Sequence, residues 1–239
     1  MSSKREREIA RRRAAKWQAR RAAAEARARR NRRIAGAVLG VAVLVGVVLI
    51  VVAVVRTLAP TTPADASPVL PPDPSLAEGR TWTATFATSV GDVEVELDGA
   101  AAPQAVAAIV DQARSGLLDG ATCYRLTVTD PMFVLQCGAL AGGPEYRFGP
   151  VENDPADGVY PAGTVAMARV AGDAYSMGGQ VFVVYADSTI PADAAGGYTV
   201  IGSVTEGLDL LQQVAEEGVQ DGTTETPVTQ VTIEKVDVQ

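Results

Sequence analysis

The sequence predicts a mainly β domain, a closed antiparallel barrel with α-helices over its ends, preceded by one transmembrane helix. Three observations predict this arrangement. Residues 34–55 are an uninterrupted apolar run, many short segments after residue 80 alternate apolar and polar side chains, and two segments there have the amphipathic spacing of a helix. Many short strands with few helices are typical of a barrel, because closure removes the unpaired edges of a sheet.

Charge divides the chain into two parts. The 239 residues carry a formal net charge of −7, yet residues 1–33 hold 14 Lys/Arg against three Glu, and the other residues hold seven Lys/Arg against 25 Asp/Glu. Two parts of such opposite charge are not expected to share one compartment or one surface.

The apolar run, IAGAVLGVAVLVGVVLIVVAVV at 34–55, predicts a transmembrane helix. It has 22 residues, and a helix of that length spans about 33 Å, close to the hydrocarbon thickness of about 30 Å. A cleaved signal peptide is the alternative, since ADA at 64–66 resembles a cleavage site, although the preceding basic region is unusually long. The positive-inside rule places the N-terminus in the cytoplasm and the chain from Arg56 onward outside it.

The segments on either side of this span have simple predicted roles. Residues 1–33 are predicted to be a basic cytoplasmic arm that lies on anionic lipid. Charge alone also allows nucleic-acid binding, but the topology explains these residues without it, so we expect no nucleic-acid partner. Residues 56–80 hold six prolines and are predicted to be an extended linker, which leaves 81–239 as the folded domain.

Each element of the domain is predicted from its pattern. Residues 81–97 alternate with period two around SVGD and predict a hairpin. Residues 102–120 predict a helix, because apolar side chains recur on one face and glycines follow. The other expected elements are a second helix at 205–218 and strands within 122–138, 163–170, 180–186, 198–204 and 228–238.

The segment TCYRLTVTDPMFVLQCG, at 122–138, carries polar residues that a core strand does not need. Arg125 and Gln136 lie in its two strands, together with both cysteines of the chain, Cys123 and Cys137. An arginine in a strand is usually a solvated edge residue, so the pattern alone leaves its role open. With two cysteines and no histidine in the chain, no metal site is predicted.

The domain resembles the cyclophilins, the peptidyl-prolyl cis-trans isomerases, over most of 81–239. DGATCYRLTVTDPMFVLQCG at 119–138 is similar to the family's DG…FHR…PGFMVQGG, and AGTVAMAR at 162–169 is similar to RG-x-LSMAN. MGGQVFVV at 177–184 resembles NGSQFFI, and GGYTVIGSVTEGLDLL at 196–211 resembles GKHTVFGKVVEGMDVV. The resemblance implies an eight-stranded barrel capped by two helices, with a peptide groove on its outer face.

The resemblance also implies roles for individual residues. Arg125 is expected to be the catalytic hydrogen-bond donor, and Gln136 is expected to orient it. The residues expected to bind the substrate are Phe133, Val134, Ala168, Arg169, Gln180, Phe182 and Tyr198. Catalysis of this kind needs no nucleophile, metal or cofactor, and the expected partners are proline-containing polypeptides.

Three departures from the family pattern bear on function. Tyr198 stands where the family has a histidine, Arg169 stands where it has an asparagine, and the tryptophan expected before Tyr198 is missing. We therefore expect a membrane-tethered, extracytoplasmic isomerase that assists the folding of exported proteins. A non-catalytic proline-peptide-binding or scaffold module on the same fold is the alternative.

The two cysteines have two possible states. If the strands within 122–138 pair as antiparallel neighbours, Cys123 and Cys137 lie nearly opposite each other. Disulfides persist outside the cytoplasm, so a bond between them is predicted there. The alternative is a pair of small buried thiols.

Overall fold

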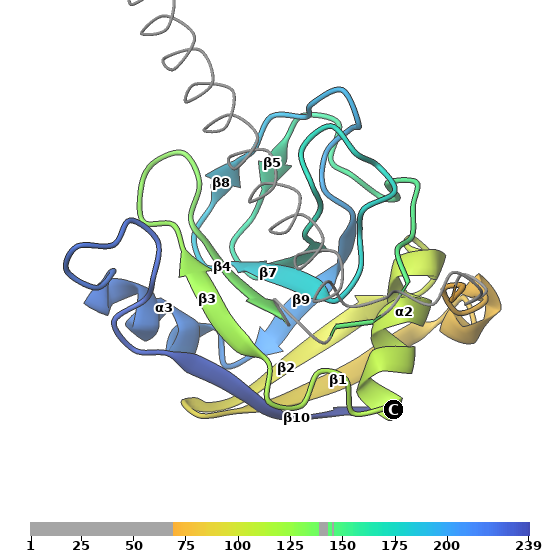
Figure 1. The fold of residues 1–239 in the computed structure, drawn as a ribbon, viewed down its shortest axis with the longest axis horizontal. Coiled ribbons are helices and arrows are strands. Elements are labelled where there is room, and N and C mark those ends of the chain that lie inside the picture. The colour runs from red at the N-terminus through yellow and green to blue at the C-terminus, as the bar shows by residue number, and fades with distance from the viewer. Residues whose placement is uncertain (1–68, 139–142, 145) are drawn as a thin grey trace, which may run out of the picture. The chain divides into compact units, whose positions relative to one another are not determined.

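A computed structural model of the protein describes residues 69–138, 143–144 and 146–239. Among these residues, eight strands form one closed antiparallel barrel in the order β1-β10-β3-β4-β7-β6-β9-β2, which confirms the predicted barrel (Figure 1). The strand bounds are β1 Thr81–Thr88, β2 Gly91–Asp98, β3 Thr122–Leu126, β4 Val134–Gly138, β6 Thr164–Met167, β7 Gln180–Val184, β9 Val200–Glu206 and β10 Val231–Val238.

The two α-helices of the described residues are those that the sequence predicts, in shorter form. They are α2, Pro103–Arg114, and α3, Leu208–Glu217, and Figure 1 shows them on opposite sides of the barrel. The predicted helix at 102–120 ends early because Gly116 adopts a φ of +70°, which turns the chain out of the helix. Leu211 of α3 points into the barrel interior and closes it on that side.

Two small elements lie outside the barrel and differ from the prediction. A two-stranded sheet joins β5, Val159–Tyr160, to β8, Ser188–Thr189. A 3₁₀ helix, η1 at Pro74–Ala77, lies inside the segment predicted to be an extended linker. Ala77 is fully buried and its carbonyl accepts a hydrogen bond of 2.8 Å from the Trp82 indole, so the packed domain begins before residue 81.

Alternation along the strands sorts the side chains into two clusters. On β4, Leu135 and Cys137 point into the barrel and join its main core, whereas Val134 points outward. The outward side chains form a second buried cluster on the barrel wall, consisting of Val134, Tyr160, Ala166, Phe182, Val184 and Ile190. The segments that carry β5 and β8 supply two of its members, so this part of the wall is covered rather than open to water.

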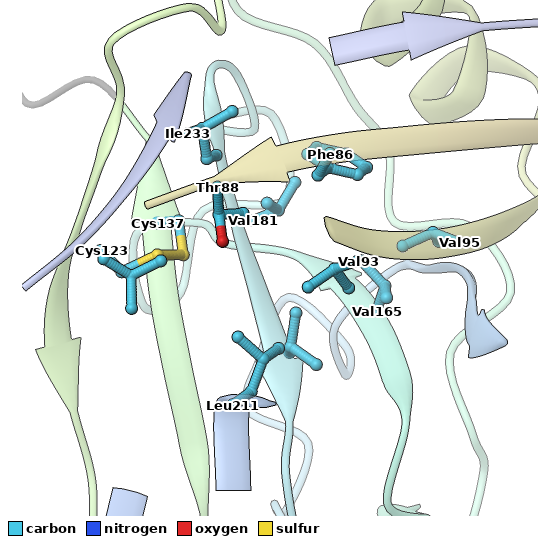
Figure 2. A pocket seen from close by; sticks show the side chains of 12 residues that line it. Phe86, Thr88, Val93, Val95, Cys123, Cys137, Val165, Val181, Leu211 and Ile233 are labelled. Atoms are coloured by element: carbon cyan, nitrogen blue, oxygen red, sulfur yellow. A yellow bond between two sulfur atoms is a disulfide. The ribbon is translucent and has the colours of Figure 1, made fainter. Parts of the chain in front are cut away.

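The barrel interior contains a small apolar cavity of about 40 Å³ (Figure 2). Cys123 of β3 and Cys137 of β4 pair directly across the two strands and are joined by a disulfide. Figure 2 shows the bonded sulfurs among the residues that line the cavity, close to Thr88 and Val181. The disulfide therefore faces the core, on the inner side of the barrel wall.

The membrane prediction falls on residues that the structure does not describe. In the described ranges, no helix is both long and apolar enough to cross a bilayer. The predicted span at 34–55, the basic arm and most of the linker lie outside those ranges.

Candidate active site

A pocket lies on the outer wall of the barrel, where β3, β4, β7 and β6 are neighbours. Its described lining residues come from these strands and the segments that follow them: Arg125, Met132, Val134, Gln136, Ala168, Arg169, Phe182, Ile190 and Tyr198. Arg125 pairs with Gln136 across β3 and β4, and Gln136 pairs with Phe182 across β4 and β7. Strand pairing thus brings three residues far apart in sequence into one row across the wall.

A β-bulge directs Arg125 to this outer face. Cys123 pairs with Cys137 and Arg125 pairs with Gln136, so β3 advances two residues while β4 moves one. The extra residue is Tyr124. Regular alternation would put Cys123 and Arg125 on the same face, but the bulge leaves the cysteine inside and turns the arginine outward.

Hydrogen bonds join the polar side chains of the pocket. Arg125 Nη1 donates to Gln136 Oε1 at 3.3 Å, and Gln136 Nε2 donates to the Tyr124 hydroxyl at 2.6 Å and to Gln180 Oε1 at 3.1 Å. The Tyr124 hydroxyl in turn donates to Gln180 Oε1 at 2.7 Å. Burial raises the pKa of Tyr124, against the opposing effects of Gln136 and Arg125, so the phenol keeps its proton. These bonds fix the Gln136 amide, which can then orient the guanidinium.

The rest of the pocket is largely apolar. The rings of Phe182 and Tyr198 meet edge to face, with centroids 5.3 Å apart and planes at 87°. Val134 is buried behind them in the outer cluster. The Tyr198 backbone N–H donates to the Tyr160 hydroxyl at 2.8 Å, which fixes the chain where the tyrosine ring closes the pocket. A charged donor therefore stands beside aromatic and aliphatic side chains of the pocket.

Comparison with a family model identifies the fold. Residues 83–238 match the model described as cyclophilin type peptidyl-prolyl cis-trans isomerase/CLD, which covers nearly all of the barrel. The chain belongs to the cyclophilin family.

Curated relatives agree with this membership. The probable peptidyl-prolyl cis-trans isomerase B of Mycobacterium tuberculosis is 34% identical over 185 residues, which cover 70% of this chain and 56% of that protein. The Mycobacterium leprae protein of that name is 32% identical over 195 residues, covering 74% and 64%. The chain thus spans less than two thirds of the length of these relatives. A peptidyl-prolyl cis-trans isomerase of Streptomyces antibioticus is 31% identical over 166 residues, covering 65% of this chain and 98% of that one.

Solved structures share the fold at lower identity. A Cryptosporidium parvum cyclophilin type isomerase superposes with a TM-score of 0.55 at 17% identity, covering 67% of this chain and 98% of that chain. Its structure in the presence of the dipeptide Ala-Pro gives a TM-score of 0.54 at 18% identity, covering 66% and 98%.

The cyclophilin pocket places most of the predicted site residues together. Seven of the predicted residues line it among the described residues: Arg125, Val134, Gln136, Ala168, Arg169, Phe182 and Tyr198. Gln180 lies beside them, bonded to Tyr124 and Gln136. Phe133 is not in the lining, because alternation along the chain turns it inward, where its ring meets Tyr185 edge-on at 6.0 Å.

Three residues in or beside this pocket were not predicted. Met132 and Ile190 line the pocket, and Tyr124 holds Gln136. The sequence indicated Tyr124 only weakly, because this residue immediately precedes Arg125 in the motif that carries the resemblance. No feature of the sequence indicated Ile190, because this residue stands in a segment that departs from the family pattern.

Arg169, which replaces the family's asparagine, has its charge neutralised within the protein. Its side chain is 1% exposed, and its guanidinium donates to the carbonyls of Val170, Gly196 and Gly197 and to both carboxylate oxygens of Asp193. The guanidinium carbon also lies 4.8 Å from the centre of the Tyr198 ring. The charge that Arg169 brings to the pocket therefore holds the segment that carries Tyr198.

Asp193 should make the stability of this segment sensitive to acid. The hydrogen bond from Arg169, with those from the Ala195 and Gly172 N–H groups, holds the pKa of Asp193 well below its usual range. Because the folded-state pKa is depressed, the stabilisation is present above the ordinary value of about 4 and is lost as pH falls toward the lowered pKa. Asp193→Asn should therefore lower the melting temperature at neutral pH, and the difference from wild type should shrink below about pH 4.

Thermal denaturation of both chains across this pH range measures the effect. Asp130→Asn is the matched control, because it removes an exposed carboxylate without touching Arg169. A gap between wild type and Asp193→Asn that is the same at every pH would contradict the role given to the carboxylate.

Proposed function

We propose that this chain is a peptidyl-prolyl cis-trans isomerase, tethered to the membrane, that assists the folding of exported proteins outside the cytoplasm. The observation that carries the activity is the hydrogen-bonded pair Arg125–Gln136 at the edge of the apolar pocket formed by Val134, Phe182 and Tyr198. A proline ring fits an apolar hollow of this kind, and the amide that precedes the ring then lies beside the guanidinium.

The chemistry requires binding rather than bond breaking. Rotation about a peptide bond has a barrier of about 18–20 kcal/mol, because the nitrogen shares its lone pair with the carbonyl. Cis and trans Xaa–Pro bonds are close in energy, yet they exchange over tens of seconds or longer. A protein that binds the twisted amide better than either planar form accelerates the exchange.

Arg125 suits this task by its chemistry. In the twisted amide the proline nitrogen becomes pyramidal, and its lone pair can accept a hydrogen bond. A guanidinium is always protonated and presents several N–H groups in a rigid plane. The bond to Gln136 fixes one of its nitrogens relative to the pocket, so the donor is held close to the binding site before the substrate arrives.

The names of related proteins and the fold of a solved cyclophilin support the proposed activity. The relatives from the two mycobacteria and from Streptomyces antibioticus are all called peptidyl-prolyl cis-trans isomerases. The fold is also that of a cyclophilin studied in the presence of Ala-Pro, which supports a proline-containing peptide as the ligand here.

A non-catalytic proline-peptide-binding module is the second candidate. The replacement of the family's groove histidine by Tyr198, together with the missing tryptophan, favours it. A protease-coupled assay on the full-length chain separates the two functions, using an Ala-Ala-Pro-Phe anilide that the protease cuts only in the trans form. We expect faster isomerisation with the folded chain. Binding of the peptide without acceleration would support the module instead.

The membrane location is proposed from the apolar run at 34–55 and the excess of basic residues before it. The basic arm then lies on the anionic inner leaflet, and the barrel reaches its substrates from the outer side.

A reporter fused after Gln239 tests this topology. A reporter that is active only outside the cytoplasm should work, and one that is active only in the cytoplasm should stay silent. Reversing the charge of residues 1–33 is the control, since it should weaken this preference. The opposite pattern in the wild-type chain would overturn the proposed location.

A further inference from the structure

The segment between α3 and β10 is a closed loop with its own hydrogen bonds. At its base the Val228 N–H donates to the Gly218 carbonyl at 3.0 Å. Further in, the Gln220 N–H donates to the Thr226 carbonyl at 2.8 Å, and the Gln220 amide donates to the Pro227 carbonyl at 3.1 Å. We call residues 218–228 the Glu225 loop. Because these bonds cross the loop, the position of its tip is defined by the fold.

Glu225 attaches this loop to β3, the strand that carries Arg125. Its backbone carbonyl accepts a hydrogen bond of 2.6 Å from the Leu126 N–H, and its carboxylate lies 3.0 Å from Arg125 Nε. Figure 1 shows the dark-blue segment between α3 and β10 beside β3. In the described strands, β10 and β3 pair through two residue pairs, Val231 with Cys123 and Thr232 with Thr122. The contacts of Glu225 therefore continue the attachment to β3 beyond the point where β10 leaves it.

The Glu225 carboxylate and the Gln136 amide hold Arg125 at two different nitrogens. The carboxylate forms an ion pair on the Nε side, and the amide oxygen accepts a hydrogen bond from Nη1. In the described part of the chain, this ion pair and this hydrogen bond are the polar contacts of the guanidinium, so Nη2 remains for a substrate. Two anchors on a planar group fix its rotation, whereas one anchor leaves it free to turn. A donor aimed at a lone pair needs this fixed direction.

We infer that Glu225 is a positioning residue for Arg125, and that the Glu225 loop is part of the isomerase site. This inference rests on the proposed function. An ion pair that is 31% and 47% exposed at its two side chains is usually weak. Here the backbone bond to Leu126 holds the Glu225 main chain beside β3, so the carboxylate starts close to Arg125 and only its side-chain torsions remain to be fixed.

Substitution of Glu225 in the full-length chain measures the effect on turnover. Glu225→Ala should lower kcat/KM about three- to fivefold, in line with the free energy of a well-oriented exposed pair. Glu225→Gln should retain more activity than Glu225→Ala, because the amide oxygen keeps a partial negative charge beside Arg125 Nε. Asp221→Ala is the matched control, since it removes a negative charge from the same loop and should leave kcat/KM unchanged.

A double-mutant cycle separates positioning from a general structural role. In the Arg125→Ala background, Glu225→Ala should have no further effect on kcat/KM, because the group that it positions is gone. An equal loss in both backgrounds, or wild-type activity in Glu225→Ala with active wild-type protein, would overturn the inference. Absence of turnover in the wild-type chain would instead reject the proposed activity. In that case the same cycle is measured as the Kd for the Ala-Ala-Pro-Phe peptide, where unchanged affinity in Glu225→Ala would overturn the inference. In an active chain this Kd should change little, because the bond from Arg125 forms in the twisted state.

Discussion

Replacing Arg125 with alanine is expected to lower kcat/KM for Xaa–Pro isomerisation at least tenfold. The substitution removes the charged donor that faces the pocket and leaves Gln136 without the guanidinium that it orients. One hydrogen bond from a charged donor contributes about 1.5–3 kcal/mol, which corresponds to a roughly 10- to 150-fold change in rate when the bond forms in the transition state. The protease-coupled assay on the full-length chain measures this loss.

Arg114→Ala is the control for Arg125→Ala. Arg114 is an exposed arginine on α2 that lies over the Trp82 ring, away from the residues that line the pocket. Its removal should leave kcat/KM unchanged. Full activity in a folded Arg125→Ala protein would refute the catalytic role of Arg125.

Removing the disulfide should lower stability much more than activity. The Cys123–Cys137 bond closes a loop with a sequence separation of 14, for which the chain-entropy model gives roughly 3 kcal/mol. Cys123→Ser with Cys137→Ser should therefore lower the melting temperature by several degrees. Activity should fall less than in Arg125→Ala, because the sulfurs face the barrel interior and do not line the pocket.

Reductant provides the control for this variant. Dithiothreitol should lower the melting temperature of the wild-type chain and leave that of the double-serine chain unchanged. Protein isolated from outside the cytoplasm should also have no titratable thiol after denaturation. Two free thiols in such protein would contradict the disulfide in the exported chain.

Most of the barrel followed from local patterns in the sequence. Period-two segments became strands, and the two amphipathic segments became α2 and α3. The short β5–β8 pair was missed, because strands of two residues carry no periodic signal. The 3₁₀ helix at Pro74–Ala77 was missed for a different reason. A proline-rich composition predicts an extended chain, whereas burial of Ala77 against Trp82 depends on a partner that composition does not show.

Pocket residues were predicted only where a motif carried them. The faces of β3 could not be read from alternation, because the bulge at Tyr124 reverses it between Cys123 and Arg125. Arg169 lines the pocket, yet its ion pair with the partly exposed Asp193 depends on a loop with no pattern of its own. Glu225 lies 100 residues after Arg125, and tertiary structure alone brings them together.

The short pairing between β10 and β3 affects how the barrel can open. In the described strands this seam holds two residue pairs, against eight between β1 and β2. Local unfolding takes the route that breaks the fewest contacts, so transient opening and amide hydrogen exchange should begin at this seam. When it opens, the disulfide keeps β3 on β4, and Arg125 and Gln136 stay side by side on one hairpin. The domain can therefore fluctuate where its strand pairing is shortest without separating the two residues proposed for catalysis.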